Sequence, residues 1–303
     1  MSLQVFLLCA TSVVCATAQD KRRPLFVFGH MANTLEDLDE YIQDGANAIE
    51  ADFTFAPNGS ALKLYHGPIN CFCGLDCEHS IDIPTYLTFM RDSVGPGGPY
   101  AGKLLLFYAD TKTDNLSGDR VYAAGVSLAQ NLIHYLWMNV PYRRMLNVIV
   151  SIFQLKDKEL LRGALDTFLQ TPNPSHYLDH VGFDVGGYNL LNDIAQTYKE
   201  LGIYKHRWQG DGAINCLMTV YPTLRTSLVI RRRTSKSSPR NYVDKSLVWT
   251  VDEMRTIRRF LRKGIDGIIT NKPANVLKVL SEKKFARKYR LAKRHDNPWL
   301  RIP

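Results

Sequence analysis

Residues 47–54 read Asn-Ala-Ile-Glu-Ala-Asp-Phe-Thr. Their apolar character predicts a buried strand, and this strand carries two carboxylates, Glu50 and Asp52, two positions apart. Because side chains alternate across a strand, both acids are expected to point to the same side. Burying two acids is unfavourable unless a positive charge neutralises them, and hard divalent cations prefer such oxygen ligands. The stretch therefore predicts a buried strand that also contributes to a metal site.

Strand-like and helix-like runs alternate on both sides of this stretch. Short apolar runs predict strands at 25–28, 47–55, 103–108, 146–152, 181–185, 206–209, 247–251 and 267–270. Helix-like runs separate them at 34–45, 121–137, 156–169, 192–201, 252–263 and from 273 onward. Eight strand–helix units in about 260 residues match the size of a TIM barrel, whereas a doubly wound sheet would need a glycine-rich phosphate loop after its first strand. We therefore expect an α/β fold, a (β/α)8 TIM barrel, as one domain over residues 19–303.

Barrel enzymes carry their catalytic groups at the C-terminal ends of the strands. The residues with chemical potential at these ends are His30, Asp110, Lys112, Trp249 and Asn271, and a short strand-like excursion after the Glu50 strand ends in His66. Together, Glu50, Asp52 and Asp110 offer oxygen ligands that suit one Mg²⁺ ion, with water and substrate phosphate as the remaining ligands. The strand ends therefore predict a metal site with two histidines beside it.

The other strand-end residues suit cleavage of a phosphodiester. His30 and His66 could act as general base and general acid. Lys112 could bind a phosphate oxygen, and the face of Trp249 attracts a quaternary ammonium group. Each residue also has a structural interpretation, because a strand-end histidine is often structural, Asp110 and Lys112 could form a surface ion pair, and Trp249 could belong to the core. Their convergence favours the functional interpretation.

The first 18 residues are uncharged and end in the small-residue sequence Ala16-Thr17-Ala18. An apolar run before such a site is typical of a secretory signal peptide, and this run is too short to span a bilayer comfortably. We therefore expect a signal peptide at 1–18 and a secreted, extracellular protein. The sequons at Asn58 and Asn115 are candidate glycosylation sites and are compatible with secretion.

The cysteines that remain after this leader are Cys71, Cys73, Cys77 and Cys216. An even number in a secreted chain suggests two disulfide bonds, and four cysteines allow three pairings. Cys71 and Cys73 are poorly placed to bond each other. A zinc site is the alternative, but Cys-x-Cys-x₃-Cys lacks the usual ligand spacing.

The formal charge of +9 is unevenly distributed along the chain. Residues 31–62 contain seven acidic residues and no Lys or Arg, whereas basic residues crowd 225–245 and 278–294. Such a surface favours a membrane surface, phosphate or nucleic acid as partner, although a soluble protein with a basic back face fits equally well. Residues 231–240 read as a basic loop, but a nuclear signal there would contradict the leader peptide. We therefore expect no nucleic-acid partner, and no protein partner is evident.

Several stretches of the chain occur together in one known family. They are Gly29-His30-Met31, Gly45-Ala46-Asn47-Ala48-Ile49-Glu50-Ala51-Asp52, Tyr65-His66-Gly67, Asp110-Thr111-Lys112-Thr113, Val248-Trp249-Thr250-Val251-Asp252 and Asp266-Gly267-Ile268-Ile269-Thr270-Asn271. Near the C-terminus, Tyr289-Arg290-Leu291-Ala292 and Asp296-Asn297-Pro298-Trp299 are similar to a plug motif of that family. In these motifs and their order, the mature chain resembles the spider-venom sphingomyelinase D (dermonecrotic toxin, phospholipase D) family and its arachnid relatives, which include tick and mite homologues.

This resemblance implies a TIM barrel related to glycerophosphodiester phosphodiesterases. It implies that one Mg²⁺ ion is held at Glu50, Asp52 and Asp110. It implies acid–base or nucleophilic roles for His30 and His66, with Lys112 and Trp249 in the substrate site, to which we add the strand-end Asn271. It also implies the two-disulfide subclass, with bonds Cys71–Cys77 and Cys73–Cys216.

The family cleaves choline from sphingomyelin or lysophosphatidylcholine, largely by internal attack of a lipid hydroxyl that yields a cyclic phosphate. The resemblance therefore implies an enzyme, a secreted Mg²⁺-dependent phospholipase D-type lyase, that acts on choline-containing sphingolipids or lysolipids at a peripheral membrane surface. The alternatives are a hydrolytic glycerophosphodiester phosphodiesterase and an inactive secreted barrel that acts as a binding protein. The chain departs from the family pattern at two positions that flank the expected head-group pocket. Leu247 stands where relatives carry an aromatic residue, and Lys272 stands where they carry tyrosine.

Overall fold

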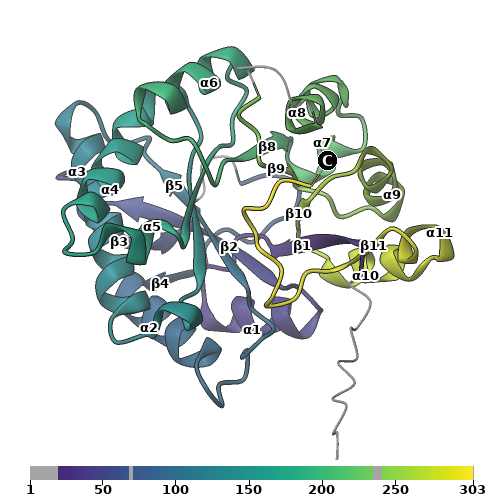
Figure 1. Cartoon of the computed structure of the whole chain (residues 1–303), viewed down its shortest axis with the longest axis horizontal. Coiled ribbons are helices and arrows are strands. Elements are labelled where there is room, and N and C mark those ends of the chain that lie inside the picture. Colours follow the sequence, from purple (N-terminus) through teal and green to yellow (C-terminus); the bar gives the residue numbers. More distant parts are fainter. Residues whose placement is uncertain (1–19, 68–70, 235–240, 303) are drawn as a thin grey trace, which may run out of the picture.

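The computed structural model describes residues 20–67, 71–234 and 241–302, so the signal peptide expected at 1–18 lies outside the described residues. The strands of its main sheet are β1 (Arg23–Gly29), β2 (Ala48–Phe55), β5 (Leu106–Lys112), β6 (Asn147–Ile152), β7 (Val181–Val185), β8 (Trp208–Gly212), β9 (Lys245–Trp249) and β10 (Gly267–Thr270). They pair in parallel in the order β7-β6-β5-β2-β1-β10-β9-β8. A bridge between Phe183 and Arg207 links the two ends of this order. The sheet is therefore a near-closed barrel (Figure 1).

A helix follows each of these strands and packs on the outside of the barrel (Figure 1). These helices are α1 (Leu35–Gln43), α2 (Ile83–Val94), α3 (Asp119–Asn131), α4 (Lys158–Leu169), α6 (Leu191–Glu200), α8 (Leu224–Thr234), α9 (Met254–Lys263) and α10 (Pro273–Ser281). The smaller elements are β3 (Ala61–Tyr65), β4 (Ser80–Asp82), β11 (Tyr289–Leu291), α5 (Pro174–Leu178), α7 (Asn215–Met218), α11 (Lys283–Ala286), the π-helical η1 (Leu132–Trp137) and the 3₁₀ turns η2 (Tyr142–Arg144) and η3 (Leu155–Asp157). The predicted α/β TIM barrel is confirmed. Among the described residues, no helix is long and apolar enough to cross a membrane.

Local sequence signals account for several element ends. A capping box begins α1, since the Thr34 hydroxyl accepts from the Asp37 N–H and the Asp37 carboxylate accepts from the Thr34 N–H. The Asn58-Gly59 turn joins β2 to the antiparallel β3, and Gly59 has the positive φ of 88° that such turns favour.

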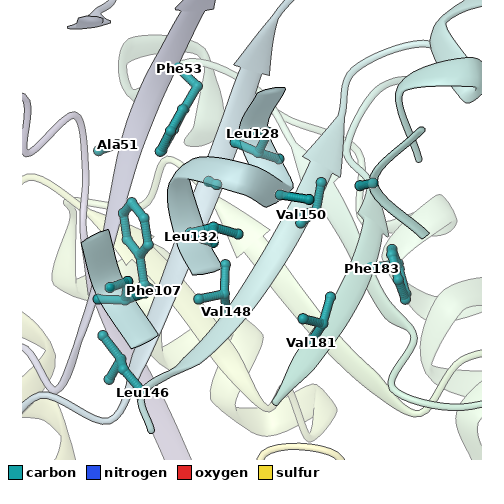
Figure 2. Close-up of a cluster of buried hydrophobic side chains, with 14 of the residues drawn as sticks. Ala51, Phe53, Phe107, Leu128, Leu132, Leu146, Val148, Val150, Val181 and Phe183 are labelled. Atoms are coloured by element: carbon teal, nitrogen blue, oxygen red, sulfur yellow. The ribbon is translucent and has the colours of Figure 1, made fainter. Parts of the chain in front are cut away.

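The core between barrel and helices is apolar and closely packed. Figure 2 shows side chains of β2, β5, β6 and β7, among them Phe53, Phe107, Val148 and Val181, beneath Leu128 of α3. Helices α3 and α4 approach so closely that a Cβ added at Gly125 would lie 1.9 Å from the carbonyl oxygen of Leu160. Glycine there lets the two helices cover this side of the barrel.

Strand β5 begins later than its sequence predicted. Residues 103–105 precede it, and the strand instead continues to Lys112 because it pairs with β2 along its whole length, from Ala48↔Leu106 to Thr54↔Lys112. The two polar residues that looked like loop positions are therefore inside a strand. Asp110 consequently lies directly opposite Asp52 in the register.

One helix was not predicted, and one strand lies at a different position from the one predicted. Helix α2 was not predicted, because its sequence is rich in aromatic and β-branched residues; Asp82 caps it, and burial of Tyr86, Leu87 and Met90 stabilises it. The sixth strand, expected at 206–209, is β8 at Trp208–Gly212. Its glycines do not favour a strand by themselves, and pairing with the neighbouring strands β7 and β9 stabilises it.

The C-terminal segment closes the N-terminal end of the barrel, and Figure 1 shows this yellow segment crossing that end. Strand β11 pairs in parallel with the first residues of β1. Trp299 is buried and donates its indole N–H to the carbonyl oxygen of Asp179 at 3.0 Å. Its ring packs so closely on Gly182 that a Cβ added to this glycine would lie 2.3 Å from the ring. The C-terminal ends of the strands, which carry Asp110 and Lys112, lie at the opposite end of the barrel.

The predicted basic loop at 231–240 is wrong for its first part, because residues 231–234 end helix α8; residues 235–240 lie outside the described residues. Arg233 is 2% exposed, and its guanidinium donates to the Asp266 carboxylate and, at 2.7 Å, to the carbonyl of Gly264. Asp266 also pairs with Arg23 at 2.8 Å. Burial alone would raise the pKa of Asp266, but Lys245, Arg233 and Arg23 lower it below its usual value. Arg233 is thus part of a buried charge network and not of a solvated surface.

We expect Arg233→Met to destabilise the protein by about 3 kcal/mol, because it removes one partner of a buried ion pair. Denaturant unfolding of the mature chain measures this free energy. The matched control is Arg231→Met on the same helix, where the side chain is exposed and the expected change is within about 0.5 kcal/mol. Equal effects of the two substitutions would contradict a structural role for the buried guanidinium.

Candidate active site

Three carboxylates converge at the open end of the barrel. Glu50 and Asp52 on β2 and Asp110 on β5 each place one oxygen within 4.8 Å of the others. Glu50 and Asp52 are 3% and 1% exposed. The Met31 N–H donates to Glu50 Oε2 at 2.7 Å, and Asn33 donates to Asp52 Oδ2 at 2.7 Å. The Met31 N–H and the Asn33 side chain therefore hold the two buried acids in position through one oxygen each.

Lys112 lies between two of these acids. Its Nζ is 2.8 Å from Asp52 Oδ1 and 2.6 Å from Asp110 Oδ2. Burial alone would lower the pKa of Lys112, but Asp110 and Asp52 raise it above its usual value, so the side chain remains a cation. Burial, Asp52 and Asp110 raise the pKa of Glu50 well above its usual value. One ammonium thus does not compensate three clustered acids, and three carboxylate oxygens at this spacing fit a hard divalent cation.

His30 is oriented by a chain of hydrogen bonds. Asn271 donates its side-chain N–H to Asp252 Oδ2 at 2.9 Å, and its Oδ1 faces His30 Nδ1 at 2.9 Å. Since this oxygen can only accept, Nδ1 carries the proton and Nε2, 3.4 Å from Thr250 Oγ1, carries the lone pair in the neutral ring. Burial lowers the pKa of His30, which favours this neutral form. His30 can therefore accept a proton at Nε2.

His66 approaches from the loop that follows β3. Its Nδ1 lies 3.0 Å from the carbonyl oxygen of Gly67. Burial alone would raise the pKa of Asp52. The positive charge of Lys112 and, to a smaller extent, that of His66 instead lower this pKa below its usual value. His66 thus lies close enough to Asp52 for its charge to influence that carboxylate.

Trp249 ends β9 and belongs to an aromatic wall. Its ring centroid lies 6.2 Å from that of Phe153 and 6.3 Å from that of Tyr188. Leu247, two residues earlier, is fully buried in the barrel. Sequence reasoning had singled out only the tryptophan, because Phe153 and Tyr188 lie in loops whose position depends on the tertiary structure.

A buried polar group beneath Trp249 was missed by sequence reasoning. The Tyr108 hydroxyl donates to Asp184 Oδ2 at 2.5 Å and lies 2.7 Å from Ser151 Oγ. Burial raises the pKa of Asp184 to about 6. A Cβ on Gly210 would lie 2.8 Å from Asp184 Oδ2 and 3.4 Å from Trp249 Nε1, so this glycine keeps space open above the carboxyl group. One feature of the sequence could have revealed this group, namely a polar residue inside each of three apolar strands. These residues are Tyr108 in β5, Ser151 in β6 and Asp184 in β7.

The residues predicted for the site form two groups of contacts. Glu50, Asp52, Asp110 and Lys112 form the first. His30 and Asn271 form the second, together with Asp252 and with Thr250, the residue after Trp249. Asn33 and Asp252 were not predicted as site residues, although the first follows His30 by three positions and the second lies in a quoted motif. Both position a site residue and do not themselves face the opening.

Two disulfide bonds shape the loop that follows His66. The structure contains Cys71–Cys77 within this loop and Cys73–Cys216 between the loop and α7. The candidate glycosylation residues lie elsewhere: Asn58 is exposed in the β2–β3 turn, and Asn115 donates its side-chain N–H to the carbonyl of Phe55 at 2.8 Å.

Fold and site together define a TIM-barrel protein with a cluster of three carboxylates at its mouth that could hold a metal ion. Residues 20–299 match the family model described as Dermonecrotic toxin SPH, and the chain belongs to this family. The dermonecrotic toxin SPH of Ixodes scapularis is 40% identical over 99% of this chain and 82% of its own length. A dermonecrotic toxin of Sicarius terrosus is 36% identical over 92% of this chain and 99% of its own length. The predicted family is confirmed.

Solved structures support the same fold at low sequence identity. A putative glycerophosphoryl diester phosphodiesterase from Silicibacter pomeroyi has a TM-score of 0.54 and 14% identity, and covers 86% of this chain and 95% of its own. A glycerophosphodiester phosphodiesterase from Parabacteroides distasonis has a TM-score of 0.52 and 15% identity, with 86% and 98% coverage. At such identities these similarities establish the barrel and leave the chemistry to the residues themselves.

Proposed function

We propose that this phosphodiester-cleaving enzyme is a secreted, Mg²⁺-dependent phospholipase D-type lyase. Its substrates are sphingomyelin and lysophospholipids such as lysophosphatidylcholine, and its products are choline and a cyclic phosphate. The observation that carries the proposal is the acidic cluster of Glu50, Asp52 and Asp110, with Lys112 between two of its members and His30 oriented beside it. The relatives named as dermonecrotic toxins support secretion, as does the presence of two disulfide bonds.

Each residue has a role that follows from its geometry. His30, with its Nε2 lone pair, removes the proton of a lipid hydroxyl that attacks the phosphorus atom. His66 protonates the oxygen of the departing head group. Lys112 binds a phosphate oxygen and stabilises the negative charge that grows there. A bound Mg²⁺ ion, held by the three carboxylates, would supply Lewis-acid stabilisation of the same phosphate.

The aromatic wall of Trp249, Phe153 and Tyr188 suits a cationic head group. Aromatic faces attract quaternary ammonium groups, and Asp184 lies behind this wall. Lys272, which replaces the tyrosine of relatives, is exposed shortly after the end of β10.

Product analysis tests the proposal. The mature protein is incubated with Mg²⁺ and sphingomyelin or lysophosphatidylcholine, and phosphorus NMR follows the products. A cyclic phosphate is the expected result. A linear monoester would instead support the hydrolytic glycerophosphodiester phosphodiesterase that the fold neighbours suggest, and bound Mg²⁺ without turnover of any lipid would identify an inactive binding protein.

Two neighbouring loops at the mouth suit a lipid surface. Leu190 after β7 is 71% exposed, and Val220 and Leu224 after β8 are 78% and 73% exposed. Residues 212–224 contain no charged side chain. Exposed apolar side chains that cluster in this way are typical of interaction surfaces. Membrane binding through these loops would bring the lipid head group to the barrel mouth.

Helix α8 holds these two loops together. Arg225 donates to the carbonyl oxygens of Gly187 and Asn189, each at 3.1 Å, and its guanidinium pairs with Asp211 at 2.8 Å. Asp211 is fully buried at the end of β8. The apolar loops are therefore anchored to the barrel and present their side chains in a defined arrangement.

We expect the triple substitution Leu190→Ser, Val220→Ser and Leu224→Ser to weaken binding to sphingomyelin vesicles by about tenfold or more, because less apolar area is removed from water. Turnover of a short-chain, monomeric lysolipid should be unchanged. Vesicle sedimentation and phosphorus NMR measure the two quantities. Leu62→Ser, Leu169→Ser and Leu300→Ser, which are exposed elsewhere at 54%, 55% and 60%, form the control. Equal binding losses in both triple variants would contradict docking through the mouth.

A further inference from the structure

A cavity of about 310 Å³ lies at the closed end of the barrel, opposite the acidic cluster. Two segments that are distant in sequence form its walls, namely the turn with η2 before β6 and residues 293–299 of the C-terminal segment. Phe26, Leu105 and Trp299 contribute apolar surface inside it. None of its lining residues belongs to the active site described above.

The rim of this cavity is positively charged. Exposed cations from both segments line it, and they are Arg143, Arg144, Lys293 and Arg294. Within residues 20–67, 71–234 and 241–302, none of these four side chains forms an ion pair. Four like charges thus converge on one opening.

The two acids that line the cavity are engaged elsewhere. Asp179 pairs with Lys205 at 3.0 Å and accepts from the Tyr142 hydroxyl at 2.9 Å. Asp296 accepts from both terminal nitrogens of Arg290, at 2.5 and 2.7 Å. Neither carboxylate is therefore available to the rim cations.

We propose that this cavity binds a small anion that bears a phosphate or sulfate group. Convergent Arg and Lys side chains form charge-assisted hydrogen bonds with such oxyanions, and a bound anion relieves the repulsion among the four cations. The cavity is of the size that small-molecule sites have in proteins. The site is independent of the proposed lipid cleavage, since it shares no residue with the barrel mouth.

Binding here would stabilise the fold as well as fill the cavity. The ligand would connect the C-terminal segment to the η2 turn, which are about 150 positions apart, so the folded state would bind it better than the unfolded chain. A ligand that binds only the folded state stabilises it by RT ln(1 + [L]/Kd), so Tm rises with ligand concentration.

The experiment uses the mature, full chain in EDTA at constant ionic strength. Inorganic phosphate, sulfate and pyrophosphate are titrated against chloride, and calorimetry and Tm are recorded. We expect saturable binding with a rise in Tm, and binding at least about tenfold weaker in the variant Arg144→Gln/Lys293→Gln, which loses charge-assisted contacts. Neither side chain forms an ion pair among the described residues, so the variant keeps the fold intact.

The control variant removes two exposed charges far from the cavity, as Lys199→Gln/Lys278→Gln, and should bind the anions like the wild type. Phosphate affinity that is unchanged in Arg144→Gln/Lys293→Gln, or absent from the wild type, would overturn the proposal. A second arm adds phosphatidic acid vesicles. Loss of vesicle binding in Arg144→Gln/Lys293→Gln, without any effect on the free anions, would assign these cations to a membrane surface instead and would equally overturn a small-anion site.

Discussion

Replacing His30 or His66 with alanine is expected to lower kcat by about 10³-fold or more, because general acid–base groups contribute on the order of 10²–10⁴ each. Mg²⁺ binding and Tm should change little, since neither histidine belongs to the acidic cluster. Turnover by phosphorus NMR and metal-dependent Tm measure the two effects. His134→Ala, which removes an exposed histidine on η1, is the control and should retain full activity.

The two histidines should differ in their response to the leaving group. His66 is assigned the protonation of the head-group oxygen, so a nitrophenyl leaving group, which departs without a proton, should largely restore turnover in His66→Ala. The same substrate should not rescue His30→Ala, because removal of the hydroxyl proton is still required. The reverse pattern would exchange the two roles, and wild-type turnover in either variant would remove that histidine from the mechanism.

The second large effect is expected from Glu50→Gln. The wild-type Tm should rise with Mg²⁺ concentration, as linkage requires for a ligand of the folded state. In Glu50→Gln this rise should disappear, and turnover should fall by about 10³-fold or more, because one of three carboxylates is lost. Thermal unfolding with and without Mg²⁺, together with phosphorus NMR, measures both results.

The same substitution should leave the metal-free protein as stable as the wild type or about 1 kcal/mol more stable. Glutamine still accepts the Met31 N–H, and it no longer places a buried charge beside Asp52 and Asp110. Asp44→Asn, an exposed acid at the end of α1, is the control and should preserve the Mg²⁺ response. A persistent Mg²⁺-dependent rise of Tm in Glu50→Gln would show that the metal binds elsewhere.

Local periodicity was enough to predict the first half of the site. Glu50 and Asp52 share a side because alternation along a strand is a property of the backbone itself, and an apolar strand with two acids indicates a neutralising cation. The capping box at Thr34 and Asp37 is equally local. The alternation of strands and helices was likewise sufficient for the barrel, since its units repeat along the chain.

Other parts of the site depended on contacts between segments distant in sequence. Asp110 and Lys112 looked like loop residues, and only pairing with β2 made them strand positions opposite Asp52 and Thr54. The tautomer of His30 follows from Asn271 and Asp252, which reach it across more than 200 positions. No local pattern encodes such a hydrogen-bond chain, because each link lies at the end of a different strand.

The sequence by itself therefore determined the family, the barrel and the residue types of the acidic site, because all three are encoded in short motifs and in local periodicity. Only the tertiary structure decided that Arg233 is buried against Asp266, that Asp184 lies behind Trp249, and that four cations converge on a cavity at the closed end. The physical reason is the same in each case. Burial and charge compensation are properties of neighbours in space, and the barrel makes neighbours of residues that the chain keeps far apart.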